Sequence, residues 1–140
     1  MEINYNFETN FALPDEDYYS DWIDRVVGSE GFVVTTLAFV FCDDAYLLDI
    51  NQKYLNHDTY TDIITFDYSD GKTISGDIFI STERVSENAN TYGVDRNTEL
   101  NRVMAHGLLH LMGYGDKTEE EALVMRAKED EKLKLFHVEH

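Results

Sequence analysis

The chain has 140 residues, which is the size of one domain and long enough to bury a single hydrophobic core. Hydrophobic residues make up 43% of it, with 8 Phe and 9 Tyr, and this composition excludes a disordered chain. The formal net charge of −17 argues by itself against RNA or DNA as a partner, because an acidic surface repels phosphates. The net charge does not exclude a cleft that is locally positive. The second half of the chain contains the basic residues Lys72, Arg84, Arg96, Arg102 and Lys117.

The sequence also bears on the cellular compartment. No apolar run approaches the roughly 20 residues of a membrane-spanning helix, and the start at Met1 lacks the pattern of a signal peptide. Cys42 is the single cysteine, so no internal disulfide can form, which is usual in a reducing compartment. We therefore expect a soluble, cytoplasmic protein with no membrane partner, folded as one domain over residues 1–140.

The first half of the chain predicts alternating strands and helices, judged from the spacing of apolar side chains. In chain order these are a strand at 3–7, a helix from Pro14 to Gly28 or Gly31, a strand at 32–41, and a helix at 45–55 capped by Asp43 or Asp44. The side chains expected on the buried faces of the two helices are Tyr19, Trp22, Ile23, Val26, Val27, Leu47, Leu48 and Asn51. The core is therefore mixed α and β.

A hairpin is predicted next. Strand patterns at 60–66 and 73–80 flank a turn at 69–71. Gly76 and Asp77 interrupt the second strand, and a glycine there marks either a bulge or the close approach of another backbone or a ligand. Asp77 accordingly has two open roles, which are to orient a ligand histidine or to cap a bulge.

Three helices complete the pattern. Ser81 or Thr82 caps a helix ending at Gly93, another runs from about Asn97 to Met112, and a capping box at 118–121 opens the last. The first of these helices carries Val85, Asn88, Ala89 and Tyr92 on one side. The expected inward-facing residues of the other two are Leu100, Val103, Met104, Leu108 and Leu111, and Ala122, Met125 and Leu133. We predict an α+β fold in which a small mixed β-sheet is packed with helices.

The second of these helices carries a metal-binding pattern. His106 and His110 are four residues apart, so both imidazoles project from one face, and Gly113 can end the helix so that Asp116 folds back toward them. Three protein ligands with an open fourth position are typical of catalytic zinc, and Cys42 alone cannot build a closed sulfur site. The pattern predicts a zincin-like helix and one zinc, or another divalent metal, per chain.

Hydrolysis is the default chemistry of such a site, because the ion lowers the pKa of its water to about 7. In zinc peptidases a glutamate that activates this water follows the first histidine. Gly107 stands at that position and cannot take a proton. A zincin-type metallopeptidase without its usual base is therefore one alternative, and a metal-stabilised module that binds the ribosome or a protein, with little catalysis, is another.

The segment 106–114 resembles the HGxLHLxGYDH signature of the YbeY family of metal-dependent, single-strand-specific endoribonucleases. Residues 51–54, 58–66 and 76–78 resemble the family's LNxxY, DxxT(D/N)VLSF and GDI segments, so the likeness spans about 44–135. It implies a zinc-dependent hydrolase that cleaves RNA during rRNA maturation, at the 3′ end of 16S rRNA, and in ribosome quality control. The implied partners are rRNA and the ribosome or its proteins, and no DNA.

Two positions depart from the family pattern. Asp116 stands where the third histidine falls, and a carboxylate can also ligate zinc. Leu55 replaces an arginine, so a phosphate clamp is missing, and Arg84 and Arg102 are candidate substitutes unless they form surface ion pairs. The expected site residues are His106, His110 and Asp116 at the metal, Arg84 and His106 in catalysis, and Asp77 and Arg102 beside a ligand histidine or the substrate.

Overall fold

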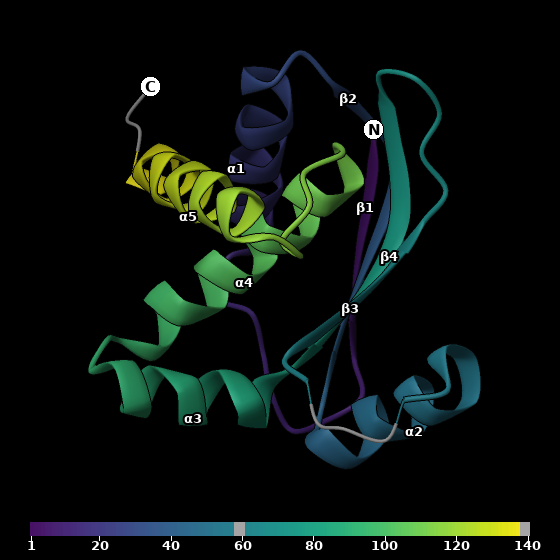
Figure 1. Cartoon of the computed structure of the whole chain (residues 1–140), viewed down its shortest axis with the longest axis vertical. Coiled ribbons are helices and arrows are strands. Elements are labelled where there is room, and N and C mark those ends of the chain that lie inside the picture. Colours follow the sequence, from purple (N-terminus) through teal and green to yellow (C-terminus); the bar gives the residue numbers. More distant parts are fainter. Residues whose placement is uncertain (58–60, 138–140) are drawn as a thin grey trace.

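The structure is a computed structural model that describes residues 1–57 and 61–137. Its elements are β1 (Glu2–Phe7), α1 (Glu16–Ser29), β2 (Val33–Cys42), α2 (Asp44–Leu55), β3 (Ile63–Asp67), β4 (Thr73–Ser81), α3 (Thr82–Tyr92), α4 (Arg96–Leu111), α5 (Glu119–Lys134) and the 3-10 turn η1 (Leu135–His137) (Figure 1). Each predicted strand and helix has its counterpart here. The strand expected from Tyr60 begins at Ile63, and Tyr60 itself lies outside the described residues.

The four strands form one mixed sheet in the order β1-β2-β4-β3. β1 and β4 both run parallel to β2, and β3 pairs antiparallel with β4 as the predicted hairpin. β2 lies inside the sheet, which agrees with its long apolar run. The register shift occurs in β2 between Val34 and Thr36, so the bulge proposed at Gly76 and Asp77 is absent from β4.

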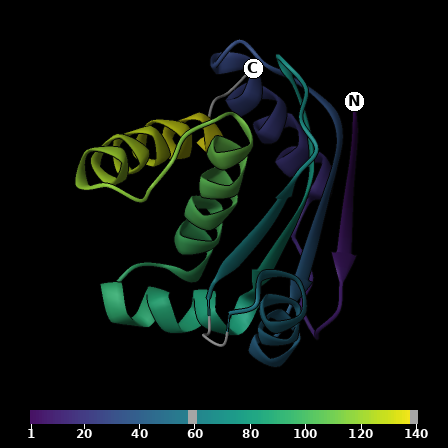
Figure 2. The same ribbon diagram turned by 45° about the vertical axis from the view of Figure 1, so that its right-hand side comes forward.

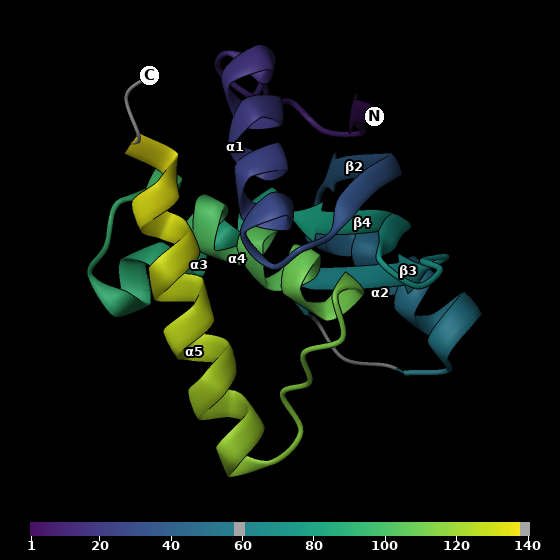
Figure 3. The same cartoon turned by 90° about the horizontal axis from the view of Figure 1, so that it is seen from above.

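The two faces of the sheet are covered differently. α1 and α4 pack on one face, where they bury Trp22, Ile78 and Met104 in the main core. α2 covers part of the other face, where Leu47 packs in a smaller cluster with Phe79. Figures 2 and 3 show α1, α4 and α5 gathered on one side of the strands. No helix in the described part of the chain is long and apolar enough to cross a membrane.

The helix ends follow the predicted signals. Ser81 caps α3 by accepting from the amide of Arg84, and Gly93 ends it in the left-handed conformation with φ 66°. The capping box of Thr118 and Glu121 opens α5 as predicted. α1 is capped by Asp15, directly after Pro14.

Several burial predictions are wrong. In α2, Leu48 is only half-buried, and Ile50 takes its place in the core. In α3, the side that carries the four predicted residues is buried at Val85 and Ala89, whereas Asn88 is half-buried and Tyr92 is 62% exposed. In α5, Ala122 is exposed and Leu133 half-buried, whereas the residues buried beside Met125 are Glu129 and Lys132. The apolar spacing missed them because this helix buries charged side chains with partners on other helices.

Candidate metal centre

The C-terminal half of α4 brings the predicted ligands together. The rings of His106 and His110 have centroids 4.5 Å apart. Gly113 follows the helix with φ 99°, which turns the chain back as predicted. Asp116 Oδ2 consequently lies 3.1 Å from Nε2 of His106 and 3.3 Å from Nε2 of His110.

The donor set fits a divalent metal ion. One ligand atom from each of the three residues lies within 4.8 Å of the others, so the group could hold one ion. The Nδ1 atom of each histidine, which faces away from Asp116, has a hydrogen-bond partner. Nδ1 of His106 is 2.6 Å from Oε2 of Glu129, and Nδ1 of His110 is 2.9 Å from the carbonyl oxygen of Tyr114. A neutral imidazole that donates from Nδ1 presents the lone pair of Nε2, here toward Asp116.

Glu129 on α5 is a site residue that the sequence analysis missed. Its side chain is 6% exposed, and its other oxygen accepts a hydrogen bond of 3.0 Å from Arg102. Burial lowers the pKa of His106, but the hydrogen bond and charge of Glu129 outweigh it, so the pKa is raised. The helical period could have indicated this residue, since Glu129 comes four positions after Met125, on the predicted buried face.

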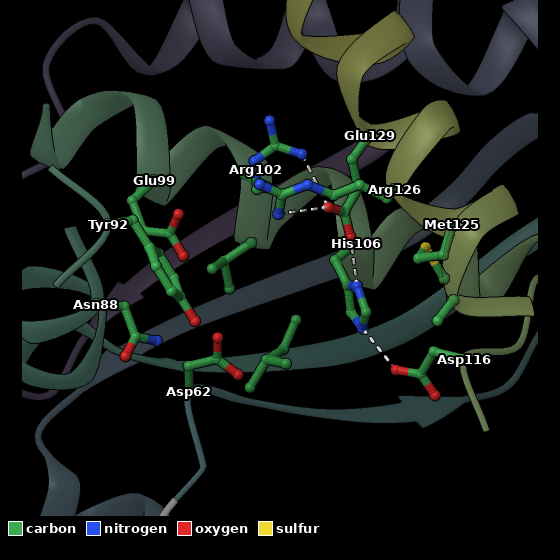
Figure 4. Close-up of a pocket in the computed structure, with 13 residues that line it drawn as sticks. Asp62, Asn88, Tyr92, Glu99, Arg102, His106, Asp116, Met125, Arg126 and Glu129 are labelled. Atoms are coloured by element: carbon green, nitrogen blue, oxygen red, sulfur yellow. Dashed lines mark hydrogen bonds and ion pairs between the residues drawn. The ribbon is translucent and has the colours of Figure 1, made fainter. Parts of the chain in front are cut away.

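A cleft of about 400 Å³ opens beside the histidines. Figure 4 shows His106 and Asp116 toward one end, while Tyr92, Asn88 and Glu99 lie toward the other. The charged residues Asp62, Arg102 and Arg126 also line its wall. Burial raises the pKa of the Asp62 and Glu99 carboxyls, and the charges of Asp62 and Glu129 raise the pKa of Glu99 further.

Arg102 belongs to this cleft. Its Nη1 contacts Glu129 and its Nη2 lies 2.7 Å from Asp130, so two carboxylates hold its guanidinium. Arg102 therefore acts on His106 through Glu129. Arg126 is the more exposed arginine of the cleft, with 61% of its side chain accessible and an Nη1 that stays 3.9 Å from Glu129.

Two other sequence predictions need correction. Arg84 lies outside the residues that line the cleft, with Nη2 2.9 Å from Asp44 and Nη1 2.8 Å from Glu87, so the surface ion pair is its observed role. Asp77 alternates with the inward-facing Gly76 and Ile78, so it faces the α2 side of the sheet, where Tyr68 donates to it at 3.3 Å. It therefore does not orient a ligand histidine.

Leu55, at the position of the family's arginine, is 41% exposed at the end of α2. It lines a separate hollow of about 390 Å³, and Ile63 contributes to both this hollow and the metal cleft. The side chain of Ile63 therefore lies between the metal cleft and Leu55, the position at which the family carries an arginine.

Two glycines bring α4 onto the sheet. A Cβ on Gly107 would lie 2.9 Å from Cδ1 of Ile63 and 3.1 Å from Cγ2 of Ile78, so this position faces β3 and β4 rather than the metal ligands. A Cβ on Gly76 would lie 2.5 Å from the carbonyl oxygen of Phe66 and 3.1 Å from Leu111 of α4. Close approach, not a bulge, is the reason for the strand glycine, and a peptidase base at 107 would point into the core.

The chain is similar to known proteins along almost its whole length. The profile of the family described as Endoribonuclease YbeY matches residues 4–137. Proteins named Endoribonuclease YbeY from Flavobacterium johnsoniae and Bacteroides thetaiotaomicron are 53% and 43% identical, covering 98% and 96% of this chain and 99% of each relative. The solution structure of TM1509 from Thermotoga maritima shares the fold, with a TM-score of 0.66 at 20% identity over 97% of this chain and 89% of that one. The chain therefore belongs to the Endoribonuclease YbeY family.

Proposed function

We propose that this protein is a zinc-dependent endoribonuclease that hydrolyses single-stranded RNA at the cleft beside His106. The observation that carries the proposal is the convergence of two imidazoles and one carboxylate within 4.8 Å, in a chain 43% to 54% identical to relatives named Endoribonuclease YbeY. Zinc suits two nitrogen ligands and one oxygen ligand, and when bound it supplies a Lewis acid and an acidified water.

The side chains of the protein would orient the metal ligands and bind the phosphate of the RNA. Glu129 fixes the ring of His106, the Tyr114 carbonyl fixes that of His110, and Asp116 completes the set of ligands. Gly107 offers no proton acceptor, so no protein base is expected at that position. Arg126 is the cation best placed to meet a phosphate in the cleft, because its side chain is largely accessible.

The biological setting follows from the family. We infer that the RNA is rRNA, that cleavage serves maturation of the 16S 3′ end and ribosome quality control, and that the ribosome or its proteins guide the enzyme in the cytoplasm. Family membership supports this setting. The metallopeptidase alternative has no support, since position 107 faces the sheet, and no contact within residues 1–57 and 61–137 favours a purely binding role.

The proposal is tested by cleavage of a single-stranded RNA oligonucleotide beside metal analysis of the same preparations. We expect one zinc per chain and cleavage that a chelator abolishes. His106→Ala and His110→Ala should each lose both the metal and the activity, whereas Asp116→His should retain zinc, because imidazole is a good zinc ligand. Chelator-resistant cleavage, or full metal occupancy in His106→Ala, would contradict the proposal.

A further inference from the structure

The end of the cleft away from the metal ligands has walls that metal binding does not use. Asn88 and Tyr92 come from α3, Glu99 from the first turns of α4, and Asp62 from the segment before β3. In Figure 4 these four side chains surround one end, while His106 marks the other. Residues from three parts of the chain thus form a second subsite in the same cleft.

Glu99 is the most informative of these residues. The residue as a whole is only 5% exposed, and its carboxylate opens onto the cleft, where none of the residues that the structure describes donates a hydrogen bond to it. The nearby Arg102 gives its hydrogen bonds to Glu129 and Asp130 instead. A carboxylate that opens onto a cleft and has no protein donor is free to accept a hydrogen bond from a ligand that brings the donor.

Tyr92 supplies an aromatic surface beside these acids. The side chain of Tyr92 is 62% exposed, although α3 buries Val85 and Ala89 in the protein interior. Its ring stacks on no other aromatic ring in the described part of the chain. Accessible aromatic rings in a cleft are the surfaces on which nucleobases stack. The amide of Asn88, half-buried on the same helix, can both donate and accept.

We propose that this end of the cleft is a nucleobase pocket for a base with an exocyclic amino group, namely adenine, cytosine or guanine. The base stacks on Tyr92, and its amino group donates to Glu99 and Asp62, as carboxylates accept from cytosine N4. The acids repel phosphate, so the backbone of the RNA lies toward Arg126 and the metal ligands. Uracil has no amino group and fits less well. This inference rests on the proposed function, because only a bound RNA would bring a base here.

The pocket is tested with compounds that an endonuclease cannot cleave. AMP, CMP, UMP and ribose 5-phosphate share one phosphate, and ribose 5-phosphate lacks the base. Their affinities for the zinc-loaded full-length chain are measured by NMR titration. We expect AMP and CMP to bind about tenfold more tightly than ribose 5-phosphate, with UMP between them, since stacking contributes a factor of this order.

Four variants show which residues cause the difference in affinity. Tyr92→Ala should remove the advantage of AMP over ribose 5-phosphate, and Tyr92→Phe should keep it because the ring remains. Tyr68→Ala is the matched control, since Tyr68 is 61% exposed but lines a different pocket. Glu99→Gln should shrink the advantage of AMP over UMP, because an amide presents both a donor and an acceptor.

Each other outcome overturns the proposal in a recognisable way. Equal binding of AMP and ribose 5-phosphate, or an unchanged difference in Tyr92→Ala, rejects the base pocket. A second metal equivalent that is lost in Glu99→Gln would make this end a cation site instead. RNA cleavage by the same preparations separates the two ideas: cleavage without base-dependent binding rejects only the pocket, and base-dependent binding without cleavage rejects only the nuclease.

Discussion

The histidine ligands depend on one residue from another helix. Glu129 binds Nδ1 of His106 and is itself held by Arg102, so a carboxylate and a guanidinium fix the ring before any ion arrives. Groups that orient metal ligands in this way typically contribute a factor of about 10 to 100 in metal affinity. The local motif around His106 is therefore incomplete without α5.

Replacing Glu129 tests this dependence. Glu129→Gln keeps the size of the side chain but removes its charge, so zinc affinity should fall about 10- to 100-fold. Competition with a chelator of known affinity measures the change. Glu131→Gln on the same helix is the control, because Glu131 is 53% exposed and pairs with Lys132 rather than with a histidine. Equal affinities in the two variants would show that Glu129 has no part in holding the ring.

The arginines of the cleft give a second prediction for single residues. Arg126→Ala should lower RNA cleavage about 10²- to 10³-fold at unchanged zinc content, because losing one donor to a developing anion typically costs that much. Arg84→Ala is the control, since Arg84 contacts Asp44 and Glu87 outside the cleft. Equal cleavage by Arg126→Ala and the wild-type protein would exclude Arg126 as the phosphate contact.

At the scale of elements, α4 packs on β3 and β4 through glycines. Gly76 leaves room for the Phe66 carbonyl oxygen and for Leu111, and Gly107 leaves room for Ile63 and Ile78. Because side chains alternate along β4, this contact also decides that Asp77 faces away from the histidines. The position of α4 therefore depends on glycine at positions 76 and 107, where a side chain would not fit.

Gly76→Ala should destabilise the protein by about 1 to 3 kcal/mol, because the new methyl group meets a backbone oxygen that cannot move easily. Gly28→Ala is the matched change in α1, where nothing lies within 4 Å of the added Cβ, and it should stabilise by roughly 0.5 to 1 kcal/mol. Urea unfolding measures both. Similar shifts of the two variants would mean that α4 and β4 are not in close contact.

The sequence predicted the boundaries of helices and strands better than it predicted which side chains contact one another. The reason is physical. Turn and cap signals are local, so Gly93, Gly113 and Thr118 could be assigned from a few neighbouring residues. Which carboxylate meets which arginine depends on helix packing far along the chain. The ion pair of Arg84 with Asp44, 40 residues away, and the contact of Glu129 with His106 have no local signal.

At the scale of the whole molecule, a buried ionic network joins α1 to α5. Lys132 is fully buried, and its ammonium group donates to Glu30 at 2.6 Å, Ser29 at 2.8 Å and Glu131 at 2.9 Å. Glu30 also accepts from Lys128 and, at 2.6 Å, from the hydroxyl of Tyr114. Figure 3 shows the two helices on the same side of the sheet.

This network gives the fold a pH dependence. Burial raises the pKa of Glu30, but hydrogen bonds from Lys132, Tyr114 and Lys128 outweigh it and lower the pKa from 4.5 to about 2. The unfolded chain therefore takes up this proton first, so the stabilisation is complete above about pH 4.5 and is lost as pH falls toward 2. Glu30→Gln should be less stable at neutral pH, with a difference that shrinks in that window.

Chemical denaturation at a series of pH values measures this difference. Glu120→Gln is the control, because Glu120 is exposed in the first turn of α5. A stability difference between Glu30→Gln and the wild-type protein that stayed constant from neutral pH to pH 2 would contradict the assignment.

Tyr114 takes part in both the network and the metal centre. Its carbonyl oxygen binds His110, and its hydroxyl binds Glu30 at the end of α1. One residue thus ties the ordering of the ligand loop to the docking of an N-terminal helix more than 80 positions earlier in the chain. Ion binding and the attachment of α1 are therefore expected to be linked equilibria, so an ion bound at these three residues would make the local opening of α1 less favourable although α1 contributes no ligand.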